Sequence, residues 1–260
     1  MMQAVRGTGR NIAGAEYVSA LTALESDRRA RTAFRARALQ LVPPGGLIYD
    51  FGAGPGLDAR FYAEHDRRVG AYDIDPEMCS YFSDYCSEFM RIGRITLQQG
   101  TYRDFLAGVR TRGDTDLVTA NFAPLNLIDD LSALFAALDG LTHASGAVLA
   151  SVLSPYYVGD LKYPWWWRNL PALLRNRRYA VPGAQAPIWR RRLADYAAAA
   201  APYFTLQRVF PGRTSPWPGS TIEAGVDARA STAWLATSRA RFMFLLFRKP
   251  AAQAPAARRS

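Results

Sequence analysis

The feature of this sequence that most constrains its fold is a glycine-rich turn that directly follows a short apolar run. Residues 47–51, LIYDF, are typical of a buried strand, and the chain continues as G-A-G-P-G through Gly56 before a helical segment. Glycines at such a turn let the backbone pass close to a ligand without a Cβ in the way. The helix that follows presents free N–H groups and the positive end of its dipole. The turn therefore predicts a nucleotide-type site at the end of a parallel strand.

Strand-like and helix-like segments alternate along most of the chain, which favours a parallel α/β sheet. The periodicity breaks after residue 153, in a long segment rich in Pro, aromatic residues and Arg, and then resumes. Insertions of this length usually form lids or binding elements. The expected strands are 47–51, 68–73, 95–99, 115–120, 147–153, 204–210 and 241–247. The expected helices are 27–41, the segment after Gly56 to about His65, 76–90, 127–141 and 188–201, with Asp27, Asp75, and Asp129 or Asp130 as N-caps.

Length and composition limit the class of protein. The 260 residues are enough to bury a core without disulfides, and 49% apolar residues exclude a disordered chain. Two cysteines, Cys79 and Cys86, exclude a disulfide scaffold and favour a reducing compartment. No targeting segment and no apolar run of membrane-spanning length is visible in the sequence. We therefore expect a globular cytoplasmic protein.

The positive charge is unevenly distributed. The chain carries 32 Lys and Arg against 22 Asp and Glu, but residues 42–153 carry 8 basic and 15 acidic side chains. Residues 154–192 carry 8 basic and one acidic side chain, and only Lys162 and Lys249 are lysines. An Arg-rich, Lys-poor chain often reflects a GC-rich coding sequence, so the charge alone is weak evidence for nucleic acid. Its distribution predicts an anionic partner for the segments outside the acidic middle.

The acids near the turn discriminate between nucleotides. Asp73 ends the second strand, a position from which carboxylates accept hydrogen bonds from ribose hydroxyls. The glycine spacing is G-x-G-x-G rather than the dinucleotide pattern G-x-G-x-x-G, and no P-loop lysine follows. Asp50, two residues before Gly52, would repel a pyrophosphate but suits an ammonium group. A nucleoside with a cationic amino-acid tail fits better than NAD or ATP.

At these residues the chain resembles class I S-adenosylmethionine-dependent methyltransferases. The blocks LIYDFGAGPG, GAYDIDPEM, ITLQQGTY, DLVTANF and GAVLASVL match that family in order and spacing, over about residues 45–153. The resemblance implies a Rossmann-like, seven-stranded, mostly parallel sheet with helices on both faces and the last strand antiparallel. We add a mainly helical cap insertion after strand five. The implied cofactor is S-adenosylmethionine, with S-adenosylhomocysteine as its product.

The same resemblance assigns cofactor contacts. Asp73 would hold the ribose hydroxyls, and Ile74 would pack on adenine. Glycine packing between strand and helix is the alternative for the turn, and a helix cap is the alternative for Asp73. The residues implied at the methionine end are Asp50, Gly52, Ala53, Gly54 and Gly56.

Further implied cofactor contacts follow other strands. Thr101 and Tyr102 stand after strand three, where the family often has an acid, so Thr101 departs from the pattern. Asn121 and Phe122, at the end of strand four, would lie beside the sulfonium and the acceptor. Tyr17 resembles the N-terminal aromatic that closes over the cofactor, and a plain core aromatic is the alternative.

Catalytic candidates are few, because methyl transfer relies chiefly on orientation and sometimes on a base. His65 and His143 fall away from the carboxyl ends of the strands, and we interpret both as surface residues. Asp160, the one acid among residues 154–192, is the candidate base, with Tyr156 and Tyr157 as polar partners. Pairing with Lys162 or Arg168 is the alternative for Asp160. No ligand-spaced cluster predicts a metal.

Asn126, Trp166 and Arg168 are the candidate acceptor-binding residues. Trp165, Trp166 and Trp167 cannot all face one core, so some must face a pocket, a partner or an interface. Four interpretations of the insertion stay open: a lid over an anionic acceptor, docking to a membrane or an acidic carrier protein, RNA binding, and a dimer contact. RNA is the least favoured of the first three, because arginine is the default cation here.

The expected activity is methyl transfer to O or C of a small or carrier-bound, anionic metabolite. The alternatives are a membrane lipid or quinone-type acceptor and a catalytically silent cofactor-binding partner protein. The expected organisation is N-terminal helices over the site (1–41), cofactor-binding core (42–153), cap insertion (154–187), C-terminal part of the sheet (188–249) and disordered tail (250–260).

Overall fold

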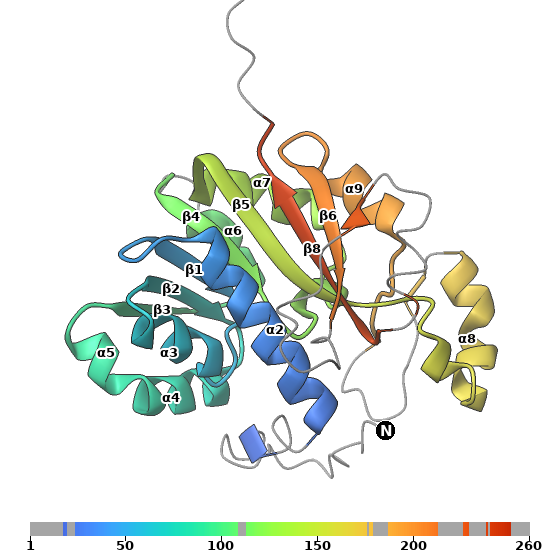
Figure 1. Cartoon of the computed structure of the whole chain (residues 1–260), viewed down its shortest axis with the longest axis horizontal. Coiled ribbons are helices and arrows are strands. Elements are labelled where there is room, and N and C mark those ends of the chain that lie inside the picture. Colours follow the sequence, from blue (N-terminus) through green and yellow to red (C-terminus); the bar gives the residue numbers. More distant parts are fainter. Residues whose placement is uncertain are drawn as a thin grey trace, which may run out of the picture.

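One mixed sheet forms the centre of the molecule. The computed structural model describes residues 18–19, 24–108, 113–175, 177–178, 187–212, 226–228, 238 and 240–250. Within these residues the strand order is β3-β2-β1-β4-β5-β8-β6-β7 (Figure 1). The strands are β1 (Leu47–Phe51), β2 (Arg68–Asp73), β3 (Ile95–Gln99), β4 (Thr115–Ala120), β5 (Thr142–Leu153), β6 (Thr205–Pro211), β7 (Val226–Asp227) and β8 (Phe242–Arg248).

The strand directions confirm the predicted sheet. β3, β2, β1, β4 and β5 pair in parallel, and β8 lies antiparallel between β5 and β6. The first four strands have the predicted bounds. β7 was not predicted, because two residues on the edge of β6 leave no periodic pattern. β5 begins at Thr142 rather than at residue 147, because its polar first residues pair with Thr115 through an irregular register.

Helices cover both faces of the sheet, as predicted. In Figure 1, α2 crosses the front face, and α6 and α7 lie behind the strands. Phe34 of α2 packs edge-on against Phe244 at 5.2 Å, and Phe135 of α7 packs against Phe247 at 5.0 Å, so each face of β8 is sealed by an aromatic pair. One face carries α2 (Glu25–Leu41), α3 (Leu57–Glu64), α4 (Pro76–Tyr85) and α5 (Ser87–Arg91), and the other carries α6 (Tyr102–Gly108), α7 (Leu131–Leu141) and α9 (Leu193–Ala200).

Several helices begin or end at other residues than the sequence predicts. The expected helix 76–90 is interrupted at Cys86, whose thiol is buried and free like that of Cys79. The helix expected from residue 127 begins at Leu131, because the Asp130 carboxylate caps it by accepting from Ala133 N at 3.0 Å. Asp27 is not an N-cap, since α2 begins at Glu25.

The helix expected at 188–201 also starts late, at Leu193, because an extended strap precedes it. In that strap, the Arg191 guanidinium donates to the carbonyls of Leu125, Ile128 and Asp129 at 2.7 to 3.3 Å. The sequence gives no sign that an arginine in a run of three is buried in this way.

The cap segment, residues 154–187, leaves the sheet at the end of β5. Its described part holds the 3-10 turn η2 (Val158–Asp160) and helix α8 (Pro164–Leu174). α8 lies at the edge of the molecule, beyond β8 and β6 (Figure 1). No helix among the described residues is long and apolar enough to span a membrane.

Candidate functional site

The candidate site lies where the carboxyl ends of the parallel strands meet, the usual ligand position of open α/β sheets. Asp50 lies near the end of β1, Asp73 ends β2, and Asn121 directly follows β4. β1 pairs with both β2 and β4, so these three side chains come from adjacent strands. The topology therefore brings together residues that the sequence separates by more than twenty positions.

The glycine turn divides into a packing glycine and an open one. Gly52, Gly54 and Gly56 all have positive φ, between +54° and +84°. A Cβ on Gly56 would lie 2.7 Å from the Phe82 ring, so this glycine serves strand–helix packing. A Cβ on Gly54 would meet nothing within 4 Å, so that backbone faces open space. The backbone N–H groups of Gly52 and Ala53 donate to Tyr72 O and fix the turn on β2.

Asp73 joins the turn to the second strand. Its carboxylate accepts from Gly54 N at 2.6 Å and from Asp75 N at 2.9 Å. Burial raises the pKa of Asp73 despite these bonds. Capping of α4 belongs to Asp75, which accepts from the N–H groups of Glu77 and Met78. Because a carboxylate oxygen has two lone pairs, Asp73 keeps acceptor capacity for a diol.

Asp50 is a buried acid without a cationic contact among the described residues. Thr119 Oγ1 donates to it at 2.9 Å. Burial, and then the neighbouring Asp58 carboxylate, raise the pKa of Asp50 to about 7. The carboxylate therefore gains most from a ligand that brings its own positive charge.

A network that sequence reasoning missed lies beside Asp50. The buried carboxylate of Asp58 accepts from Arg31 at 2.7 Å, from Arg35 at 2.6 Å and from Asn121 Nδ2 at 2.9 Å. Burial opposes ionisation of Asp58, but the two arginines and the amide lower its pKa. The spacing of Arg31 and Arg35 places them on one helix face. Only the packing of α2 on α3 brings them to Asp58.

The same network holds the chain after β4. Asn121 Oδ1 accepts from Phe122 N at 2.9 Å. Phe122 and Ala123 have φ of 60° and 70°, a left-handed conformation that is strained for residues other than glycine. The Phe122 ring packs on Phe242, and the Arg31 guanidinium lies 4.3 Å from its centroid. Asn121 and Phe122 thus lie at the site, as the sequence predicts, and Arg31 lies beside them, which the sequence does not predict.

The remaining predicted cofactor residues lie nearby. The Ile74 side chain is 58% exposed directly after Asp73. Thr101 caps α6, since its hydroxyl accepts from Asp104 N at 3.2 Å, and its hydroxyl and N–H donate in return to the Asp104 carboxylate. Tyr102 packs on Phe105, and its buried hydroxyl has no hydrogen-bond partner among the described residues. Tyr17 lies outside the described residues.

The predicted acceptor residues are mostly held by the scaffold. Asp160 forms a buried ion pair with Arg190, rather than with Lys162 or Arg168. The Asn126 side chain in η1 (Pro124–Asn126) is buried: it donates to Trp189 O and accepts from Leu153 N. Its amide is therefore used to join β5 to the strap.

The other predicted acceptor residues differ in exposure. Trp166 faces inward on α8, whereas Arg168 is exposed. Tyr156 is exposed and Tyr157 is half-buried in the loop after β5. Only Arg168 and the two tyrosines thus keep side-chain surface for an acceptor.

The ion pair predicts the behaviour of an Asp160→Asn variant. An amide keeps the volume and one acceptor for Arg190, so we expect turnover to stay within about threefold of the unaltered chain. A general base at this position would instead lose about 100-fold or more. Initial rates with saturating cofactor separate the two, with the thermal midpoint as the control for folding.

Other titratable groups do not add to the site. His65 stacks on Phe61 and bonds to its carbonyl, and His143 pairs with Asp116 at the amino ends of the strands. Among the described residues, no group of three or more His, Cys, Asp and Glu side chains is arranged to hold a metal ion.

The similarity of this chain to known proteins is more extensive in structure than in sequence. No family model matches it. A curated relative, the ribosomal protein L11 methyltransferase of Pelotomaculum thermopropionicum, is 33% identical over 129 residues, which are 49% of this chain and 39% of the relative. The match thus spans about two fifths of the relative's length.

Solved structures cover nearly the whole chain. A TehB-like SAM-dependent methyltransferase from Corynebacterium glutamicum has a TM-score of 0.54 at 14% identity, over 91% of this chain and 96% of that one. An S-adenosylmethionine-dependent methyltransferase from Mesorhizobium loti has a TM-score of 0.54 at 16% identity, over 84% and 96%. A geranyl diphosphate methyltransferase, solved with geranyl diphosphate and sinefungin, has a TM-score of 0.57 at 15% identity, over 95% and 86%. The chain has the class I methyltransferase fold.

The methyltransferase fold accounts for the sheet and for the location of the site. Strands β3-β2-β1-β4-β5-β8-β6 follow its order, with the last strand of the chain antiparallel. The resemblance seen at the glycine turn is thereby confirmed for the fold.

Proposed function

We propose that this chain binds S-adenosylmethionine and transfers its methyl group to an anionic metabolite. The observation that carries the proposal is the joint placement of Asp50, the open turn at Gly54 and Asp73 on two adjacent strand ends. A buried acid with no ion-pair partner in the described part of the chain suits an ammonium group, and a second carboxylate across the turn suits a ribose diol. The exposed Ile74 side chain supplies an apolar surface for the base.

The residues present fit this cofactor in charge. The pyrophosphate of a dinucleotide would meet three carboxylates, Asp50, Asp58 and Asp73, of which only Asp58 is paired with arginine. Bound S-adenosylmethionine would supply a methyl group already activated on sulfur. The chain's own part is to orient it, with Asn121 and Phe122 fixed beside the reacting end by Asp58 and Arg31.

For the acceptor, we propose O or C of a small or carrier-bound anionic metabolite. Arg31 lies over Phe122 beside Asn121, so one guanidinium group stands at the end of β4, and Arg168 offers a second, exposed guanidinium on α8. Asp160 is neutralised by Arg190, which favours transfer by proximity and orientation over strong base catalysis. The neighbour that binds geranyl diphosphate supports an acceptor with an apolar body and an anionic head. We also propose a cytoplasmic location, in keeping with the free thiols of Cys79 and Cys86.

Labelled turnover tests this function directly. The purified chain is incubated with S-adenosylmethionine carrying a labelled methyl group and with fractionated extract, and labelled products are identified by mass spectrometry. We expect label in an acidic small molecule or carrier-bound product. Cofactor binding without any labelled product would instead support a silent cofactor-binding protein, and label in ribosomal protein or RNA would assign another acceptor class.

A further inference from the structure

Helix α8 exposes an apolar stripe that nothing in the described structure covers. Trp167 is 56% exposed and Leu174 is 65% exposed, and Pro171 between them is also exposed. Their spacing of four and three residues places all three on one helix face. Leu161 extends this face, because its carbonyl accepts from Trp167 Nε1 at 2.8 Å and its side chain is exposed. We call Leu161, Trp167, Pro171 and Leu174 the α8 stripe.

The opposite face of α8 explains why the stripe points outward. Trp166 and Leu173 are buried in a small cluster with Trp165, Leu170 and Ala172, separate from the two clusters on the sheet. The Trp166 and Trp167 rings meet edge-on at 5.0 Å, so the exposed indole is held rigidly. A solvent-facing side of a soluble helix normally carries polar residues. Here an apolar line of exposed residues runs along the outer side, next to the exposed Arg168 and Arg175.

Basic side chains border the stripe. Arg168 and Arg175 fall on one flank of the helix, and Lys162 and Arg177 lie just before and after it; all four are exposed. None of the four forms an ion pair with a described residue. The nearby acid, Asp160, is buried and paired with Arg190. This border is therefore positive without local compensation.

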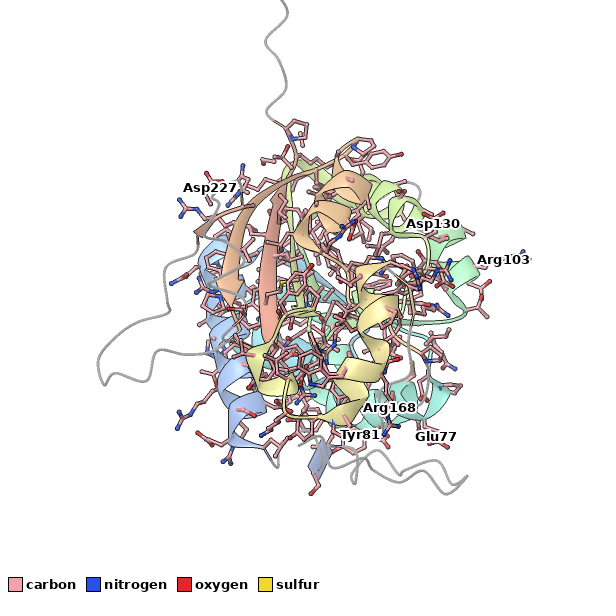
Figure 2. The ribbon with its side chains drawn as sticks, turned by 90° about the vertical axis from the view of Figure 1, so that its right-hand side faces the viewer. Glu77, Tyr81, Arg103, Asp130, Arg168 and Asp227 are labelled. Atoms are coloured by element: carbon pink, nitrogen blue, oxygen red, sulfur yellow. The ribbon has the colours of Figure 1, made fainter. Side chains whose placement is uncertain are left out.

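We propose that the α8 stripe and its basic border dock this protein onto an anionic lipid surface. A helix with Trp and Leu on one side and Arg and Lys beside them lies stably at the headgroup boundary of acidic membranes. Helix α8 also projects at the edge of the molecule, so a flat surface can reach it (Figure 1). In Figure 2 this side faces the viewer, with Arg168 near the lower end of α8.

Other occupants fit these side chains less well. RNA binding uses aromatic stacking and phosphate contacts, and leaves Leu161, Pro171 and Leu174 without a role. A second copy of this chain would bring the same uncompensated positive charges together. Lipid headgroups satisfy the charges, and the acyl boundary takes the apolar side chains.

Vesicle sedimentation tests the proposal without reference to methyl transfer. The full chain is mixed with phosphatidylcholine vesicles, with or without about 30% phosphatidylglycerol, at low and high salt. We expect bound protein to be about fivefold higher or more on the anionic vesicles at low salt, and this excess to shrink at high salt. A Trp167→Ala/Leu174→Ala variant should lose about tenfold in binding, and Arg175→Glu/Arg177→Glu should lose the preference for anionic lipid.

Matched variants elsewhere on the surface serve as controls. Ile92→Ala removes an apolar side chain of similar exposure, 55%, at the end of α5. Arg91→Glu/Arg103→Glu makes the same charge change on α5 and α6. Both controls should bind vesicles like the unaltered chain, and thermal midpoints check folding in all four. Equal binding to neutral and anionic vesicles, no effect of the stripe variant, or loss of self-association in that variant without any vesicle binding would each overturn the proposal.

Discussion

An Asp73→Ala variant is expected to lose about 100-fold or more in affinity for S-adenosylmethionine. The side chain sits at the end of β2 with acceptor capacity left after its bonds to Gly54 N and Asp75 N. Two hydrogen bonds from ribose hydroxyls to a partly buried carboxylate, each contributing about 1.5–3 kcal/mol, account for a loss of this size. Isothermal titration calorimetry with the purified chain measures it.

The neighbouring acid provides the control for this variant. Asp75→Ala removes the α4 cap and should lower the free energy of unfolding by about 1 kcal/mol, with affinity nearly unchanged. Asp73→Asn should bind S-adenosylmethionine more tightly than Asp73→Ala and more weakly than Asp75→Ala, because the amide oxygen still accepts from Gly54 N. Unchanged affinity in Asp73→Ala would remove the ribose assignment, whatever its effect on folding.

The second large effect concerns Asp50, where stability and binding should move in opposite directions. With its pKa raised from 3.8 to about 7, Asp50 binds a proton more tightly in the folded chain than in the unfolded one. Its ionisation therefore destabilises the fold progressively as the pH rises from about 4 to about 7, and fully above that. Asp50→Asn removes this effect while the amide oxygen still accepts from Thr119. We expect a gain on the order of 3 kcal/mol at pH 8 and almost none at pH 4.

The same variant should bind S-adenosylmethionine about 10- to 100-fold more weakly, since the amide cannot neutralise an ammonium group. In the unaltered chain, affinity should rise as the pH increases from about 5.5 to 7.5, because binding favours the ionised acid; in Asp50→Asn this dependence should flatten. Urea unfolding and calorimetry across this range measure both quantities.

Asp58→Asn is the matched control for Asp50→Asn, and we expect it to change folding stability at pH 8 in the opposite direction. Its carboxylate is equally buried but paired with Arg31 and Arg35, which lower its pKa, so its ionisation stabilises the fold above the unfolded pKa and this stability is lost as the pH falls. The variant should therefore be less stable at pH 8. If both variants shifted stability in the same direction, the difference in charge environment between these two acids would be refuted.

Most of the sheet could be predicted from the sequence, because apolar runs and turns are local signals. Strands 47–51, 68–73, 95–99 and 115–120 have the predicted bounds, and Asp75 and Asp130 cap the expected helices. The failures occur where backbone pairing or a buried side chain overrides the pattern. β5 gains a polar start through pairing with Thr115, and α9 starts late because Arg191 is buried in the strap.

For the site, the sequence identified the residues on the strand ends but not those that support them. Asp50, Gly54 and Asp73 belong to short sequence motifs that can be recognised directly. They come together because β1 and β2 are neighbours in the sheet. Asp58 and Arg31 meet only through the packing of two helices, which no local pattern records. Asp160 carried a functional hypothesis because it is isolated in a basic segment. Its partner, Arg190, was hidden in a run of three arginines.

The most direct test of the central claim is equilibrium binding of S-adenosylmethionine to the unaltered chain, with S-adenosylhomocysteine, NAD and ATP measured alongside. The account predicts saturable binding of the first two at about one molecule per chain, and no comparable binding of NAD or ATP. Absence of saturable S-adenosylmethionine binding up to about 1 mM, or tighter binding of NAD or ATP, would contradict it.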